Sequence, residues 1–191
     1  MTRPTGRLPE VDTTALTDEQ QRLHESLMSR PEVAALGLVG PFGVWMHAPE
    51  LGLAMSRLGG HVRFTSSLAP NVTEVAICTT GAFHHAKFEF AAHRGLAIRA
   101  GVDEAAVDRL GAGDDPGFEG DEAAAYAVAT EILRDHRVSE ATYADAEARF
   151  GSRGMVELLT TVGYYCLIST LLNGFDIPLV EGMTDPFPDA P

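Results

Sequence analysis

The sequence has little cysteine and no paired-cysteine motif. Its 191 residues include two cysteines, Cys78 and Cys166, both inside apolar runs, and no C-x-x-C pair. The first residues, MTRPTGRLPEVD, also lack the apolar segment of a secretory signal. Disulfide-stabilised proteins belong mainly to oxidising compartments, so these absences favour a reduced, intracellular setting. We predict a cytoplasmic protein.

Basic residues are also few. The chain has 14 Lys and Arg residues against 27 Asp and Glu residues, which gives a formal net charge of −13. Nucleic acids and anionic membranes bind proteins through basic patches. The charge balance therefore argues against both as partners.

Alternating strand patterns of useful length are also missing, as are repeats and obvious linkers. Helical periodicity runs through the chain instead, and 191 residues suffice for one domain with a substantial core. We predict a single all-α domain over residues 1–191, with an N-terminal arm at about 1–16 and a Pro/Asp-rich tail at about 176–191. Capping residues and apolar spacing predict helices that start near Thr17, Pro49 and Pro70, span 84–98, follow Asp103, Asp121 and Ser139, and span 153–173.

The longest apolar stretch, MVELLTTVGYYCLISTLL at 155–172, approaches the length of a membrane span. It contains Glu157 and several threonines and tyrosines. We expect a buried core helix here and no membrane partner.

Glycines predict where helices weaken or stop. The pair Gly59–Gly60 either weakens the middle of its helix or lets a neighbour approach closely. Gly81 is expected to interrupt the helix that begins at Pro70, and Gly101 is well placed as a C-terminal cap.

The segment GAFHHAKFEFAAH, residues 81–93, sets three histidines and a glutamate among apolar residues. On a helix over 84–98, His85, Glu89 and His93 lie at i, i+4 and i+8 within about 80° of one face, and His84 points away. Such groups are costly to bury unless they are satisfied. The pattern alone allows either a hydrogen-bonded polar seam or a functional site.

Two chemistries are open to such a site. A spacing of i to i+8 spreads ligands over about 12 Å, so one metal ion cannot easily contact both His85 and His93. Glu89 beside His93 suits proton transfer without a metal, and we prefer this interpretation. Glu74, in an apolar helix after Pro70, is either a buried partner of these groups or a first-turn glutamate favoured by the helix dipole.

Three motifs, TEVAI, KFEFAAH and GLAIRAGVDEAAVDRL, resemble the core motif of the carboxymuconolactone decarboxylase family, which shares its fold with alkyl hydroperoxidase D. The resemblance extends into PFGVWMHAPELGLAMSRLGGHVRF and GMVELLTTVGYYCLISTLLNGFDIPL, and so covers roughly residues 10–180. It implies an all-helical domain that forms homo-oligomers, commonly trimers or hexamers with a dimer as the alternative, and active sites near subunit interfaces.

The resemblance also implies roles for particular residues. In the peroxidase branch a glutamate is followed by C-x-x-C and a histidine; here Glu74 and His93 match the glutamate and histidine, while Ala86 and Glu89 stand at the cysteine positions. Thiol-based peroxide chemistry therefore has no nucleophile here. The sequence resembles instead the thiol-free branch with a [YF]-E-[WF]-x-x-H motif, at 88–93.

By this resemblance Glu74, Glu89 and His93 are the expected catalytic groups. His85 lies outside the family pattern and is a further catalytic candidate that could tune substrate choice.

The leading hypothesis is an enzyme without metal or cofactor that applies acid/base chemistry to a small enolisable organic acid, lactone or ring compound. Decarboxylation, isomerisation or a related lyase reaction would fit. Phe42, Trp45, His47 and Phe88 are the expected substrate-binding residues. The alternatives are an alkyl hydroperoxidase-like antioxidant, a metal-dependent variant that uses His84 or His85 with Glu89 and His93, and a non-catalytic ligand-binding protein of the same fold.

Overall fold

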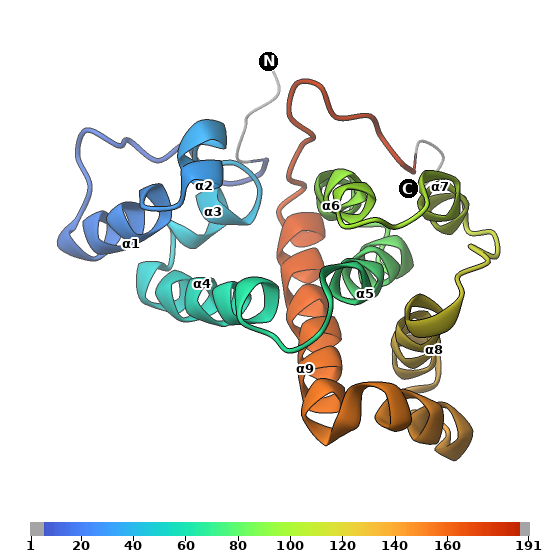
Figure 1. Ribbon diagram of the computed structural model, residues 1–191. Helices are drawn as coiled ribbons and strands as arrows, with labels where there is room; N and C mark the ends of the chain where they lie inside the picture. Colours follow the sequence, from blue (N-terminus) through green and yellow to red (C-terminus); the bar gives the residue numbers. More distant parts are fainter. Residues whose placement is uncertain (1–5, 188–191) are drawn as a thin grey trace.

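The part of the chain that the structure describes, residues 6–187 of a computed structural model, is built from α-helices without a strand (Figure 1). This confirms the all-α prediction. The elements are α1 (Asp18–Met28), α2 (Pro31–Leu36), α3 (Pro41–Trp45), α4 (Pro49–Phe64), α5 (Pro70–Phe83), α6 (Lys87–Arg99), α7 (Glu104–Ala112), α8 (Gly120–Asp135) and α9 (Glu140–Gly174). The outermost parts of the predicted arm and tail, residues 1–5 and 188–191, lie outside the described residues.

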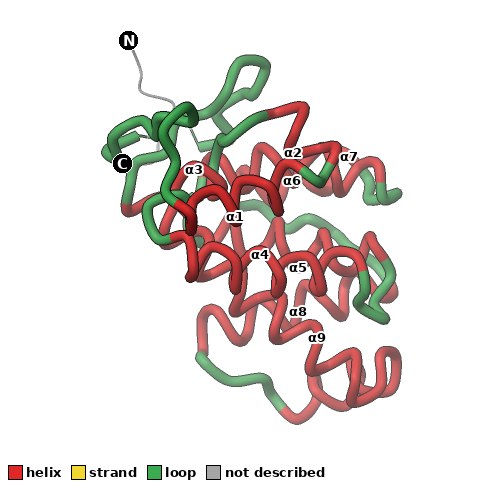
Figure 2. The backbone as a smooth tube through the Cα atoms, turned by 90° about the vertical axis from the view of Figure 1, so that its left-hand side faces the viewer, coloured by secondary structure: helices red, strands yellow, loops and turns green. Residues whose placement is uncertain are grey.

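Helix α9 organises the molecule. Figure 1 shows its C-terminal half running through the middle, with α1–α4 on one side and α5–α8 on the other. Each side has its own apolar core, and α9 supplies buried residues to both: Leu158 and Val162 to the core with α5–α8, and Ile168 and Leu172 to the core with α1–α4. Viewed from the side, the same helices stack on one another and green loops join their ends (Figure 2).

The apolar stretch 155–172 thus forms a core helix, as expected. By length and composition alone α9 could cross a membrane, but half of its most apolar window is buried inside the molecule. Tyr164, Tyr165 and Thr161, which interrupt its hydrophobicity, are buried, and Tyr164 donates a hydrogen bond to the Met55 carbonyl at 3.1 Å; Thr160 and Thr170 are exposed.

Most helix starts follow the predicted caps. Thr17 and Gln20 form a reciprocal capping box, and the side chains of Asp103 and Ser139 accept hydrogen bonds from the first turns of α7 and α9. The prediction for Asp121 is wrong by two residues, because Glu119 occupies the N-cap of α8 and Asp121 lies in the first turn.

The two helices predicted at Ser139 and at 153–173 are joined in one element. Within α9 the two helices meet at Gly151, whose φ of +66° and ψ of 172° are not helical, so that a sharp kink separates them instead of a loop.

The connection between α5 and α6 differs most from the prediction. Helix α5 continues through Gly81 to Phe83, so Gly81 is no interruption, and α6 starts at Lys87 instead of residue 84. His85 adopts a left-handed conformation (φ +47°), and the amides of His85 and Ala86 bond to the carbonyls of Ala82 and Gly81. This is a Schellman termination with histidine in the position that glycine usually occupies, and it turns the chain back on itself.

The same motif ends α6, where Gly101 (φ +99°) takes the left-handed position as predicted. Gly81 faces α6: a Cβ there would lie 3.4 Å from the backbone nitrogen of Phe90, an ordinary van der Waals contact, so the packing of α6 on α5 leaves room for a methyl group at this position.

Gly59 and Gly60 are distinguished by what surrounds them. A Cβ on Gly59 would lie 2.8 Å from the ring carbon Cζ of Tyr164, whereas a Cβ on Gly60 would have Arg30 Nη2 as its nearest neighbour at 3.7 Å. Gly59 therefore admits the Tyr164 ring, and Gly60 has room for a side chain.

We predict opposite effects of alanine at these two positions. Gly59→Ala should lower the free energy of unfolding by about 1–3 kcal/mol because it displaces a hydrogen-bonded tyrosine. Gly60→Ala, its matched control, should raise it by up to about 1 kcal/mol through helix propensity. Urea denaturation of both variants measures the difference, and equal effects would contradict the close approach of Tyr164.

Candidate active site

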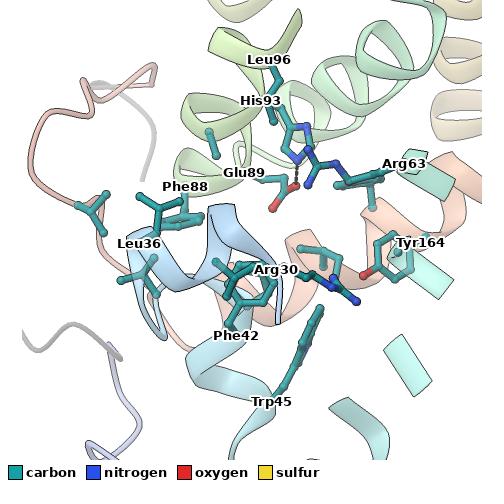
Figure 3. Close-up of a pocket in the computed structure, with 18 of the residues that line it drawn as sticks. Arg30, Leu36, Phe42, Trp45, Arg63, Phe88, Glu89, His93, Leu96 and Tyr164 are labelled. Carbon is teal, nitrogen blue, oxygen red and sulfur yellow. Dashed lines mark ion pairs between the residues drawn. The ribbon is translucent and has the colours of Figure 1, made fainter. Parts of the chain in front are cut away.

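A cavity of about 260 Å³ lies between α2–α4, α6 and the C-terminal half of α9 (Figure 3). The segment after α9 closes it with Val180 and Met183. Its volume falls just below the usual range of about 300–1,000 Å³ for ligand pockets, which suits a small molecule. Its lining includes five of the residues predicted for the site: Phe42, Trp45, Phe88, Glu89 and His93.

A histidine clamped between two carboxylates lies at one wall of this pocket. His93 Nδ1 is 2.7 Å from Glu74 Oε2, and His93 Nε2 is 3.0 Å from Glu89 Oε1. Glu89 and His93 share one face of α6 at i and i+4, while Glu74 reaches them from α5, which packs against α6. All three side chains of this carboxylate–histidine trio are buried, between 3% and 8% exposed.

The charge of His93 follows from this setting. Burial by itself would lower its pKa, but the charges of Glu74 and Glu89 and their two hydrogen bonds outweigh burial and raise the pKa to about 9. The ring is therefore an imidazolium at neutral pH, and each of its nitrogens donates to one carboxylate.

Tyr165 of α9 packs edge-on against the His93 ring, with centroids 5.1 Å apart. Burial, followed by the charge of Glu89, raises the pKa of Tyr165 well above its ordinary value, so its hydroxyl stays protonated. The phenol lines the pocket beside the trio and is a neutral donor available to a ligand.

Glu89 is the member of the trio that can meet a substrate. Figure 3 shows one of its oxygens paired with His93 and the other directed into the open space of the pocket. Glu74 does not line the pocket and lies behind His93. The arrangement thus presents one carboxylate oxygen to the ligand and holds a fixed positive charge directly behind it.

Several pocket residues had no signal in the sequence analysis. Arg30, Arg63 and Arg99 line the cavity, together with Tyr164 and Tyr165. The tyrosine pair stands out in an apolar helix and could have been singled out. The arginines come from three different helix ends or loops, and nothing in their sequence neighbours brings them together.

The predicted grouping of His85 with Glu89 and His93 is wrong. Because α6 starts at Lys87, His85 lies in the turn before it, exposed, with its ring against Phe187 at 5.3 Å. His84 caps the end of α5 and also lies away from the pocket, and His47 is exposed just after α3.

Metal ligation has no support in the geometry of residues 6–187. Within them, no group of three His, Cys, Asp or Glu side chains is arranged to hold a metal ion. The metal-dependent alternative needed His84 or His85 beside the trio, and the turn between α5 and α6 places both elsewhere.

Comparison with known proteins identifies the fold. No protein-family model matches the chain, and no curated protein matches it. Among solved structures, an uncharacterized peroxidase-related protein from Ralstonia eutropha with an alkylhydroperoxidase AhpD core is 14% identical and has a TM-score of 0.76, with 94% of both chains covered.

Two further structures agree. A protein of unknown function from Agrobacterium tumefaciens that carries the AhpD name is 13% identical, with a TM-score of 0.62 over 72% of this chain and 95% of that one. The debrominase Bmp8, a cysteine-to-alanine variant in complex with 2,3,4-tribromopyrrole, is 12% identical, with a TM-score of 0.69 over 95% of this chain and 94% of that one.

These likenesses define the class of protein: the chain has the AhpD-like fold, which the sequence motifs predicted. One of the similar proteins is an enzyme, the debrominase. Identities of 12–14% carry the fold and leave the activity to be argued from the site itself.

We predict that NMR titration of the imidazole of His93 gives a pKa of about 9. Because this lies above the ~6.5 of a histidine in an unfolded chain, protonated His93 stabilises the fold fully below about pH 6.5. That stabilisation is lost as the pH rises through about 9, so the free energy of unfolding should fall over this interval.

Two variants test the cause. Glu74→Gln removes one of the two carboxylates and should lower the pKa of His93, whereas Glu157→Gln changes a partly buried carboxylate on α9 that binds Ser66 and Ser67 and should leave it unchanged. A wild-type value near 6.5, or equal shifts in both variants, would refute the carboxylate clamp.

Proposed function

We propose that the protein is a cofactor-independent acid/base enzyme that moves a proton at a carbon next to a carbonyl group in a small organic acid, lactone or ring compound. The observation that supports this most is Glu89, whose carboxylate has one oxygen held by a buried imidazolium and the other open to an apolar pocket. A carboxylate placed in this way can take a proton from a bound substrate and return it.

The steps follow from the contacts. The open oxygen of Glu89 removes a proton from the carbon next to the carbonyl, and the C–H electron pair moves to form an enolate. The positive charge of His93, fixed by Glu74, lies behind Glu89, and the neutral hydroxyl of Tyr165 can donate to the enolate oxygen. In a substrate with a C=C bond next to the deprotonated carbon, the enolate extends into a dienolate. Glu89 then returns the proton to the far carbon of that bond, the C=C bond shifts into conjugation with the carbonyl, and the isomerisation is complete.

Decarboxylation would use the same groups in another order. The C–C bond to the departing carboxylate breaks, carbon dioxide leaves, and the electron pair stays as an enolate, whose carbon takes a proton that Glu89 relays from solvent water. Both reactions use only the trio and the pocket, without an external cofactor. His93 holds Glu89 in position and places a positive charge beside its carboxylate.

The role of His93 is therefore narrower than the sequence suggested. Both of its nitrogens donate to carboxylates, so the free imidazole nitrogen that a general base needs is not present at neutral pH. We assign proton transfer to Glu89 and positioning to His93 and Glu74.

A screen for solvent hydrogen exchange tests this function without knowledge of the natural substrate. In D₂O the wild-type protein should exchange carbon-bound hydrogen in at least one member of a panel of oxo acids, lactones and cyclic ketones, followed by ¹H NMR. Glu89→Gln should slow that exchange by roughly 10²- to 10⁴-fold, the usual contribution of a positioned acid or base.

His85→Ala is the matched control, because this histidine lies outside the pocket, and it should leave the exchange rate unchanged. Exchange that survives Glu89→Gln would refute the assigned role. Absence of exchange across the whole panel would favour the non-catalytic ligand-binding alternative.

Thiol peroxidase activity is the competing function, because one similar structure is a peroxidase-related protein. Neither cysteine lines the pocket: Cys78 is fully buried in the core and Cys166 is half-buried elsewhere on α9. Burial, followed by the charges of Glu74 and Glu89, raises the pKa of Cys78 well above its ordinary value and disfavours the reactive thiolate.

We therefore expect no consumption of cumene hydroperoxide above background with dithiothreitol as reductant, and no change in Cys78→Ser. Peroxide loss that requires the Cys78 thiol would overturn this expectation and, with it, the view that the site is thiol-free.

A further inference from the structure

Three arginines line the pocket without a carboxylate partner. Four arginines elsewhere in the described chain pair with acids: Arg22, Arg94, Arg149 and Arg153 each lie within 3.1 Å of an Asp or Glu oxygen, whereas others, such as the exposed Arg57, form no ion pair. Arg30, Arg63 and Arg99, the pocket arginines, form no ion pair within residues 6–187. The one carboxylate that lines the pocket, Glu89, is paired with His93.

Arg63 has the clearest unmet need. Its Nε is buried and has no hydrogen-bond partner among the described residues, and its guanidinium lies over the Phe64 ring at 4.9 Å from the centroid. Figure 3 shows the side chain reaching into the pocket next to Glu89 and His93. Arg30 differs, because its Nη2 already donates hydrogen bonds to the backbone carbonyl and to the hydroxyl of Ser56.

A second buried donor borders the same space. Trp45 is 3% exposed and lines the pocket, and its Nε1 also lacks a partner in the described part of the chain. Buried donors are normally satisfied, so donors left open at a pocket indicate what its ligand supplies. Arginine and tryptophan are donors only, so the ligand must bring acceptor oxygens.

Much of the remaining lining is apolar, apart from Arg30, Arg99 and the two tyrosines. Phe42, Phe88, Leu96 and Ile168 form its walls, and Val180 and Met183 close it. The body of the ligand is therefore hydrophobic, and Arg63 is the lining arginine that offers a buried nitrogen without a partner to its acceptor oxygens.

We propose that Arg63 determines substrate specificity by binding the carboxylate of a hydrophobic organic acid whose enolisable carbonyl meets Glu89. The planar fork of a guanidinium matches a carboxylate with two parallel hydrogen bonds. A neutral ring compound or lactone of the same shape leaves the Arg63 donors unsatisfied and is rejected for that reason.

This inference rests on the proposed function and narrows it. A carboxylate held by Arg63 keeps its charge during proton transfer at another carbon, whereas loss of that group as carbon dioxide would leave Arg63 without its partner. Tight binding of the ground-state carboxylate would thus oppose its own departure. Arg63 therefore favours isomerisation of an acid that retains its carboxylate over decarboxylation at that group.

The single tryptophan of the chain makes the test direct. Trp45 lines the pocket, so its fluorescence reports on ligands that enter. The probes are cyclohexylacetate and its neutral isostere cyclohexylacetamide, neither of which absorbs at the wavelength that excites tryptophan. Cyclohexylacetate should change the emission of Trp45 with a Kd at least about tenfold lower than that of the amide, the scale of one charge-assisted hydrogen bond.

Variants assign the preference to Arg63. Arg63→Met should abolish it, and Arg63→Lys should retain part of it because a charge remains without the planar fork. Arg57→Met is the matched control, since Arg57 is an exposed arginine of the same helix that does not line the pocket, and it should keep the full preference. Circular dichroism establishes whether each variant is folded. If Arg63→Met does not fold, the Arg63→Lys variant decides the outcome.

Glu89→Gln separates this inference from the proposed function. It should slow hydrogen exchange as predicted above and keep the preference for the acid, because Arg63 is intact. A preference that survives Arg63→Met, or equal responses to the two probes, including no response to either, would overturn the role of Arg63 while leaving the exchange result for Glu89 standing.

Discussion

A buried imidazolium between two carboxylates is the interaction on which the arrangement of this protein depends. Its three members come from α5 and α6, and the aromatic ring that flanks it comes from α9. A buried charge that loses a partner is costly, so the trio tolerates little change in the positions of these helices. The left-handed turn at His85 folds α6 back against α5 and so brings the members of the trio together.

This constraint also shapes the chemistry that the site supports. By resemblance, Glu89 occupies a position at which related peroxidases carry a cysteine. A thiol there can be oxidised and reduced, whereas a carboxylate exchanges only protons at neutral pH. Because His93 is charged and both its nitrogens donate to carboxylates, the proton transfer that we propose uses the open oxygen of Glu89.

The features that the sequence predicted correctly are those determined by residues close together in the chain. The caps at Thr17, Asp103 and Ser139 were predicted because a helix cap depends on three or four neighbouring residues. The turn at His85 was missed because glycine, the usual sign of a left-handed helix end, is absent from it. That one error placed His85 on the face of Glu89 and His93.

The candidate site divides in the same way. Glu89 and His93 are four residues apart on one helix, so periodicity alone could group them, and the family motif added Glu74 from the preceding helix. The pocket arginines could not be grouped, since Arg30, Arg63 and Arg99 are separated by more than thirty residues each along the chain and meet only through the packing of α4 and α6 around α9. Long-range packing of this kind leaves no periodic trace in the sequence.

The two sides of the molecule therefore contribute different things to the pocket. The carboxylate–histidine trio comes from α5 and α6, and much of the remaining pocket lining, including Phe42, Trp45 and Arg63, comes from α3 and α4 on the other side of α9. Phe42 and Trp45 take no part in the ion pairs of the trio. Under the proposed function, substitutions at these two aromatic residues would change the shape of the pocket while the trio keeps its geometry, so that one proton-transfer centre would serve different substrates.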